Sequence, residues 1–275
     1  MTRIGVVGAG RAGVGMALAL QRAGHEVRLH ARRGKDVPPP LVLSWGGPPP
    51  WIGEVEVILL AVKDDAIAVA ASELARAGGV DARHVVLHLS GMLDEAPLAA
   101  LRPSGAALGC FHPLQAIARP EEAAARLRGA LAALTGDPPA VAAGERLATS
   151  LGMRPVRLPG AAKPRYHTAA AIASNYLVVL AAAAEQLMIE AGLDPAVARD
   201  GVAALMAGTL ANARADGAAA LTGPIVRGDV ATVRAHLAVL PPELQDLYRA
   251  LGRAALAHAR LPDPSARELR SLLGA

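Results

Sequence analysis

Short apolar runs alternate with stretches of helical periodicity over the first 158 residues. The runs predict five strands and two weaker ones, at residues 3–7, 25–30, 55–62, 84–89, 107–111, 131–134 and 155–158. The periodic stretches predict helices at residues 14–23, 66–77 and 139–151. Strands that alternate with helices form a mostly parallel sheet, so this half predicts a doubly wound α/β domain of the Rossmann type.

The pattern changes after residue 158. The segment 159–164 is rich in glycine and proline, and no β pattern follows it. Helices are predicted instead, at residues 165–191, 195–213, 230–239, 242–260 and 265–272. We therefore expect a Rossmann domain over residues 1–160 and an all-α domain for substrate binding and dimerisation over residues 161–275.

A glycine-rich turn, Gly8-Ala9-Gly10-Arg11-Ala12-Gly13, lies between the first predicted strand and the first predicted helix. This is the context that a G-x-G-x-x-G dinucleotide fingerprint requires. In that motif the glycines allow a tight turn, a close approach of the pyrophosphate and close helix–strand packing, while helix N–H groups meet the phosphates. Gly8, Gly10, Arg11, Ala12 and Gly13 are thus candidate cofactor-binding residues; the alternative is a glycine-rich turn without a ligand.

The end of the second strand indicates which dinucleotide binds. NAD enzymes usually have Asp or Glu there, which accepts from the ribose 2′-hydroxyl. This chain has Ala31-Arg32-Arg33. Guanidinium groups without an acid favour a 2′-phosphate, so Arg32 is predicted to help bind NADP. The alternative is that the arginines belong to a solvated turn.

Ligands of such sheets collect at the carboxyl ends of the strands. Five candidates lie at the carboxyl ends of three of the predicted strands, either as the last strand residue or just after it: Val62, Lys63, Ser90, Gly91 and His112. We expect the nicotinamide over Val62-Lys63 and Ser90-Gly91. His112 is then a candidate proton carrier, and a structural imidazole hydrogen-bonded to the backbone is the alternative.

Composition excludes several classes of protein. The longest uncharged apolar run, residues 168–184, is shorter than the roughly 20 residues that span a bilayer, and the N-terminus lacks a signal-peptide pattern. The single cysteine, Cys110, excludes an internal disulfide and is interpreted as a buried apolar residue. We therefore expect a cytoplasmic protein without a membrane partner. A net charge of +4 without basic blocks argues against nucleic acid and suits an acidic small-molecule substrate.

One stripe of the long helix carries His167, Ala171, Ser174 and Asn175. Asn175 is one of only two asparagines and lies mid-helix, where Asn is a poor choice, so it is a candidate site residue. His167 is a further candidate, and the alternative is a residue that caps the helix or packs near its start. Residues 168–184 are apolar on every side, which predicts a homodimer through the helical domain.

Three features together resemble a bacterial family that joins a Rossmann-like domain to a C-terminal helical domain of unknown function. They are the fingerprint 8–13, the strand end Phe111-His112-Pro113-Leu114-Gln115, and the helical half with Ala173-Ser174-Asn175 and the loop 222–229 (TGPIVRGD). The family is related to the ketopantoate reductase, 6-phosphogluconate dehydrogenase, prephenate dehydrogenase and pyrroline-carboxylate reductase group. The resemblance covers essentially the whole chain and implies a ketopantoate reductase-like activity as a candidate.

The chain departs from that group at one position. Its hydroxy-acid dehydrogenases carry a catalytic lysine four residues before an asparagine; the asparagine matches Asn175, but Ala171 stands at the lysine position. His112 resembles the histidine of the prephenate dehydrogenase His-Pro motif, with His167 and Lys163 as further acid/base candidates.

The resulting hypothesis is hydride transfer between NADP(H) and a small 2-oxo or 2-hydroxy acid in a cleft between the domains. In this scheme Asn175 holds the substrate, Arg227 binds its carboxylate and His112 relays the proton. The rival hypothesis is a non-catalytic NADP-binding sensor or regulatory protein, which the missing lysine favours. No metal site is predicted.

Overall fold

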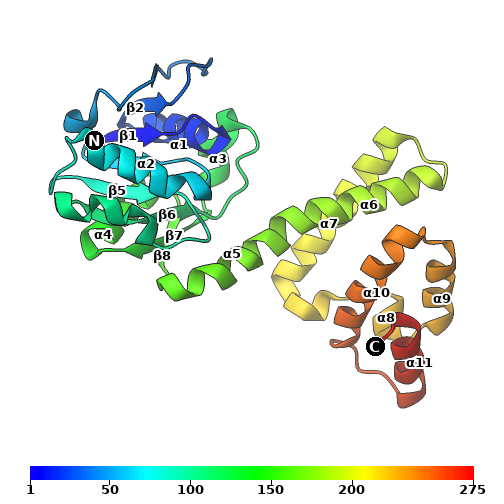
Figure 1. Cartoon of the computed structure of the whole chain (residues 1–275). Coiled ribbons are helices and arrows are strands. Elements are labelled where there is room, and N and C mark those ends of the chain that lie inside the picture. The colour runs from blue at the N-terminus through cyan, green and yellow to red at the C-terminus, as the bar shows by residue number, and fades with distance from the viewer. The chain divides into compact units, whose positions relative to one another are not determined.

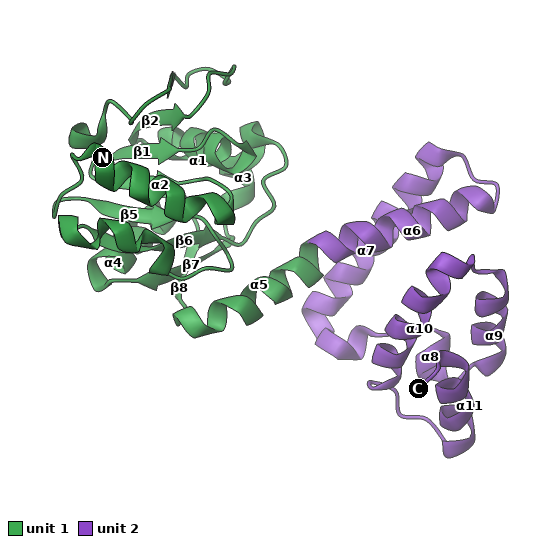
Figure 2. Cartoon of the chain, viewed as in Figure 1, with its two compact units in different colours: residues 1–174 green, residues 175–275 purple.

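The computed structural model describes all 275 residues (Figure 1). The chain divides into two compact units, Met1–Ser174 and Asn175–Ala275 (Figure 2). The first unit contains every strand, and the second is entirely helical. The predicted fold class, a Rossmann domain followed by an all-α part, is confirmed. The predicted domain boundary after residue 160 stays a prediction; the last strand ends at Arg157, before that position.

One eight-stranded sheet organises the first unit, in the order β3-β2-β1-β4-β5-β6-β7-β8. Its strands are β1 (Arg3–Val7), β2 (Glu26–Ala31), β3 (Leu43–Trp45), β4 (Val57–Leu60), β5 (Val85–His88), β6 (Ala107–Pro113), β7 (Leu131–Gly136) and β8 (Arg154–Arg157). Neighbouring strands are parallel, except that β7 runs antiparallel to β6. Strand β3 lies between two runs of three prolines, residues 38–40 and 48–50, where the sequence predicts no strand. Strand β6 continues through His112, beyond its predicted end at Phe111.

Helices cover both faces of the sheet (Figure 1). Alternate residues of β4 show this directly. Leu59 packs in the core cluster that includes α1 (Arg11–Arg22) and α4 (Pro138–Ser150). Ile58 and Leu60 pack in a second cluster, which includes α2 (Asp64–Ala77). The short helix α3 (Ala123–Leu127) joins the first cluster and the 3₁₀ segment Ala96–Ser104 the second. A central strand buried on both faces is the mark of a doubly wound sheet.

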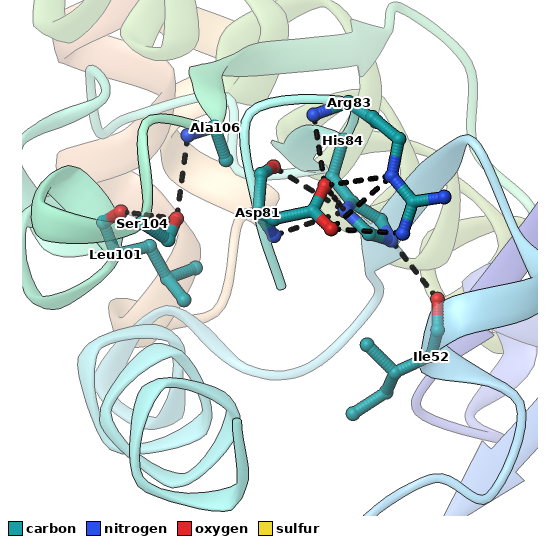
Figure 3. Close-up of polar contacts among 7 residues, drawn as sticks. All are labelled: Ile52, Asp81, Arg83, His84, Leu101, Ser104 and Ala106. Carbon is teal, nitrogen blue, oxygen red and sulfur yellow. Dashed lines mark hydrogen bonds and ion pairs between the residues drawn. The ribbon is translucent and has the colours of Figure 1, made fainter. Parts of the chain in front are cut away.

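The turn before β5 is held by side chains (Figure 3). Asp81 pairs with Arg83 at 2.8 Å and accepts its backbone N–H, while the buried His84 ring lies 3.0 Å from the carbonyl oxygen of Ile52. These bonds satisfy His84 within the fold. Because the turn lies at the amino end of β5, its polar groups are structural and far from the strand ends that carry the candidate site.

The second unit begins within a π-helical turn, Ile172–Tyr176, that joins α5 (Lys163–Ala171) to α6 (Leu177–Glu190). Its other helices are α7 (Pro195–Asp216), α8 (Pro224–Arg227), α9 (Val230–Val239), α10 (Pro242–Leu256) and α11 (Asp263–Leu273). Asp194 and Asp229 cap α7 and α9 by accepting backbone N–H bonds, as their side chains are suited to do. A small core of Val233, Leu237, Leu269 and Leu273 holds the last helices together.

The expectation that no segment is long enough to span a membrane needs correction. The helical segment Gly160–Glu190 has 31 residues, and by length and composition alone it passes the test for a membrane-spanning helix. The uncharged run counted from the sequence is only its apolar middle. One such helix is weak evidence by itself; none of its apolar window is buried within the chain.

Candidate active site

The three glycines of the turn before α1 differ in the space around them. A Cβ on Gly8 would lie 2.3 Å from the Ala61 carbonyl oxygen, and the residue has φ +114°, which favours glycine. A Cβ on Gly13 would lie 1.9 Å from the Gly8 carbonyl oxygen. A Cβ on Gly10 would meet nothing within 4 Å. Gly8 and Gly13 are thus required by the fold itself, whereas the space beside Gly10 is open to a ligand.

The N-terminus of α1 is free to bind an anion. No side chain caps it, and its first turn contains no acidic residue. Arg11 and Ala12, the first two helical residues, are exposed. Uncapped N–H groups at a helix N-terminus attract phosphate. The open space at Gly10 and this uncapped helix end therefore fit the pyrophosphate of a dinucleotide.

Arg32 and Arg33 follow the last residue of β2 and are both exposed. No carboxylate lies within salt-bridge distance of either guanidinium. Val62 lies beside the turn, since its Cγ1 would be 3.1 Å from a Cβ on Gly8, and Lys63 is exposed at the start of α2. This end of the sheet thus offers unpaired positive charge to a phosphorylated ribose.

Ser90 organises the loop after β5. Its hydroxyl donates to the Asp64 carboxylate at 2.8 Å and accepts the backbone N–H groups of Met92 and Leu93 at 3.1 and 3.0 Å. The Ser90 side chain is buried. A ligand over this loop would therefore meet backbone atoms, because the hydroxyl is already used within the protein.

Lys163, the first residue of α5, is fully buried. Its ammonium donates to the Ser90 carbonyl oxygen at 2.9 Å and to Cys110 Sγ at 2.8 Å. No carboxylate lies within 4.0 Å of it. The contact joins the loop after β5, strand β6 and helix α5. Cys110 is buried, as predicted, but it belongs to this polar cluster.

His112 lies at the centre of the cluster. Its Nδ1 is 3.0 Å from the Tyr166 hydroxyl, and its ring meets the Tyr166 and His167 rings edge to face, with centroids 5.5 and 6.1 Å apart. A Cβ on Gly91 would lie 2.8 Å from His112 Nε2 and 2.5 Å from His167 Cδ2. The backbone of Gly91 therefore lies directly against both histidine rings, and any larger residue would displace them.

The second nitrogen of His112 is available. Nε2 has no hydrogen-bond partner within the protein. The only side-chain nitrogen or oxygen that is both shielded from solvent and without a partner is Gln21 Oε1, so Nε2 is not shielded from solvent. His112 Nε2 is therefore accessible at the surface of the cluster. A ring with one nitrogen held by a tyrosine and the other free is arranged to exchange a proton with a ligand.

The surroundings set the charge of these groups. Burial, followed by the ammonium of Lys163 and the ring of His167, lowers the pKa of His112 to about 4. Burial raises the pKa of Tyr166 to about 12, and the neighbouring Cys110 contributes to the same shift. Burial also raises the pKa of Cys110, although Lys163 opposes the shift. Near neutral pH the imidazole is uncharged, while the phenol and thiol keep their protons.

The structure thus brings together Ser90, Gly91, His112, Lys163 and His167 from three separate segments. Sequence reasoning missed Tyr166, which is one of three tyrosines in a chain with few aromatic residues. Tyr166 lies one residue before His167 and three residues after Lys163 on one helix, and this spacing could have identified it as a site residue.

Asn175 and Arg227 belong to the second unit. Asn175 is exposed and lies in the π-helical turn, so the helical period assumed for the predicted stripe ends at Ala171. Such turns occur frequently at functional sites. Arg227 is exposed too and is the last residue of α8. Their assignment to substrate and carboxylate binding stays a prediction.

Comparison with known proteins supports the fold. Residues 130–255, slightly less than half of the chain, match the model of a domain of unknown function, DUF2520. No curated protein matches the sequence. The resemblance to a family with a Rossmann-like part and a helical domain of unknown function is confirmed.

Three solved structures share the architecture at low identity. A candidate NADP oxidoreductase from Bacteroides fragilis has a TM-score of 0.75 at 20% identity, over 93% of this chain and 98% of that one. A reductive aminase from Aspergillus terreus, in complex with NADPH and ethyl levulinate, has 0.65 at 17%, over 98% and 99%. The pyrroline carboxylate reductase of Plasmodium falciparum, with NADP bound, has 0.62 at 10%, over 98% of each chain. The fold is therefore that of two-part Rossmann reductases.

The different surroundings of Gly10 and Gly13 give a matched pair of tests. Gly10→Ala should fold like the unmodified protein but bind NADPH at least about tenfold more weakly, because the methyl group enters the open space. Gly13→Ala should lower the melting temperature, since its Cβ would overlap the Gly8 carbonyl oxygen. Calorimetric titration and thermal denaturation measure the two effects.

Gly53→Ala is the control. Gly53 also has open space beside it, but it precedes β4 and therefore lies at the amino end of the strands, away from the glycine-rich turn. Unchanged NADPH affinity in the Gly10 variant would contradict the assignment of this space to the pyrophosphate.

Proposed function

We propose that this chain is an NADP(H)-dependent oxidoreductase that transfers hydride between the nicotinamide and a small 2-oxo or 2-hydroxy acid. The observation that carries the proposal is the convergence of Gly91, His112 and Tyr166 over the buried Lys163, on the sheet edge where the open dinucleotide turn also lies. Two of the similar structures contain NADP or NADPH. Ketopantoate is a candidate substrate through the family resemblance alone.

The protein's own groups have distinct roles in this proposal. NADPH supplies the hydride when bound. The backbone at Gly91 supports the reacting end of the ligands, and His112 exchanges the proton through its free Nε2. Tyr166 orients the imidazole through Nδ1. The Lys163 ammonium lies beneath and acts through Ser90 and Cys110, so it holds the loop and supplies positive potential without touching the substrate.

The rival function is an NADP-binding sensor without turnover. A panel of 2-oxo acids, ketopantoate first, should distinguish the two when NADPH oxidation is followed spectrophotometrically. The panel should also contain 1-pyrroline-5-carboxylate, because a similar structure is that of a 1-pyrroline-5-carboxylate reductase. Tight NADPH binding without oxidation by any member of the panel would favour the sensor.

The cofactor preference depends on the arginines after β2. NADPH should bind at least about tenfold more tightly than NADH, since a charge-assisted hydrogen bond contributes roughly 1.5–3 kcal/mol. Arg32→Asp should abolish the preference. The control is Arg76→Asp, which makes the same charge change on an exposed arginine in the last turn of α2. Equal affinities of the unmodified protein for NADPH and NADH, measured by calorimetry, would refute the NADP assignment.

His112 is tested by turnover and by pH. His112→Asn should lower turnover by ~10²–10⁴ and leave NADPH affinity nearly unchanged. With a pKa of about 4, the ring must gain a proton before it can donate one, so kcat/KM for reduction should fall about tenfold per pH unit above that value. In the oxidation direction the neutral ring accepts, so kcat/KM should instead fall below about pH 4.

The matched control is His236→Asn. His236 forms a similar pair with Tyr248, at 2.9 Å, but it is exposed and lies in the second unit. If both histidine variants lose the same small amount of activity, His112 is a structural residue.

We also propose that the chain forms a homodimer through its helical part. Large apolar side chains of α6 and α7 are exposed, namely Val178 at 68%, Val179 at 54%, Leu205 at 65% and Leu210 at 65%. An exposed apolar surface of this kind marks an interface. Light scattering should show a dimer at micromolar concentration, and Val178→Glu with Leu205→Glu should yield monomers. A monomeric unmodified protein would refute the proposal. Binding of the unmodified protein to lipid vesicles would also refute it, because the apolar side chains of α6 and α7 would then contact a membrane.

A further inference from the structure

The two tryptophans of the chain have opposite environments. Trp51 is 5% exposed, stacks on Gly5 and donates its indole N–H to Ser44 Oγ. Trp45 is 66% exposed, and its indole N–H has no partner. Packing in the core explains the first residue. It does not explain the second, in a chain with only six aromatic residues.

Trp45 lies at the carboxyl end of the strands, at the same end of the sheet as the two arginines. It is the last residue of β3, and it pairs in register with Ala31, the last residue of the parallel strand β2. The Gly46 N–H donates to the Ala31 carbonyl oxygen at 3.3 Å, which fixes the end of β3 against β2. Arg32 and Arg33 follow Ala31 directly. The exposed indole and the two unpaired guanidiniums therefore occupy neighbouring strand ends.

The indole is held in place from one side only. A Cβ on Gly34 would lie 3.2 to 3.4 Å from three atoms of the Trp45 ring, so the ring rests against the backbone of the loop that contains the arginines. A glycine at this position lets the ring lie close to the chain. The indole is thus positioned by the fold while most of its surface stays open.

We propose that Trp45 is the surface on which the adenine ring of the dinucleotide stacks, with Arg32 and Arg33 beside its 2′-phosphate. The inference rests on the proposed function and extends it to the adenosine half of the cofactor. An indole is the largest aromatic surface that a protein offers, and stacking on a base favours binding whichever base it is. Positive charge beside the ring adds the contact with the phosphate.

The test uses adenosine 2′,5′-bisphosphate, which has the adenine and the 2′-phosphate but no nicotinamide. Trp45→Ala should bind it about tenfold more weakly than the unmodified protein, and Trp45→Phe should lose less, because a phenyl ring still stacks. Inorganic pyrophosphate should bind all three proteins equally. Calorimetry gives the affinities, and circular dichroism confirms that each variant is folded.

Fluorescence provides a second readout from the same pair of tryptophans. In Trp51→Phe the only indole is Trp45, and adenosine 2′,5′-bisphosphate should quench it strongly. In Trp45→Phe the only indole is the buried Trp51, and quenching should be small.

Equal affinity of the unmodified protein and Trp45→Ala for adenosine 2′,5′-bisphosphate would overturn the stacking proposal, while the NADPH preference could still stand. Loss of pyrophosphate binding in Trp45→Ala would also overturn it, since the residue would then support the fold of the turn. If the unmodified protein binds neither adenosine 2′,5′-bisphosphate nor NADPH, the proposed function fails together with this inference.

Discussion

The candidate site depends on one buried cation. Removing an ammonium group from water costs several kcal/mol unless polar partners replace the solvent, and Lys163 has only the Ser90 carbonyl oxygen and the Cys110 sulfur within bonding distance. Those two contacts hold the loop after β5 and the middle of β6 against helix α5. The position of Gly91 against His112 follows from that arrangement. The uncharged state of His112 follows in part from the same cation, after burial.

The sequence is sufficient to predict features with local causes. Apolar runs of strand length, the glycine-rich turn and the break after residue 158 predict the Rossmann sheet and the helical half. Because ligands of an open parallel sheet bind at the carboxyl ends of its strands, the sequence also predicts that Ser90, Gly91 and His112 share one edge. The different surroundings of Gly10 and Gly13 agree with the roles that the motif assigns, because the turn geometry is encoded by residues close together in the chain.

Features that depend on docking between distant segments are not predictable in this way. The pairing of Tyr166 with His112 requires α5 to lie across the end of β6, and no periodicity reveals that contact. Strand β3 is too short and too close to prolines to produce a pattern of its own, so the sequence does not reveal that Trp45 lies at a strand end. The π-helical turn also escapes a prediction that assumes a constant helical period up to Asn175.

The chain uses positive charge in two different ways at the two ends of the proposed cofactor site. Arg32 and Arg33 are exposed, so solvent and salt screen them and they contribute to affinity by direct contact with an anion. Lys163 is buried, where screening is weak and a charge acts over a longer distance. It lies eight residues before Ala171, the position at which the hydroxy-acid dehydrogenases that the sequence resembles carry their lysine. A cation beneath the site can favour negative charge that develops on a substrate oxygen, but it is too enclosed to deliver a proton. In the proposed mechanism Lys163 therefore supplies positive potential, and His112 transfers the proton. These two residues divide the functions that a single lysine would perform.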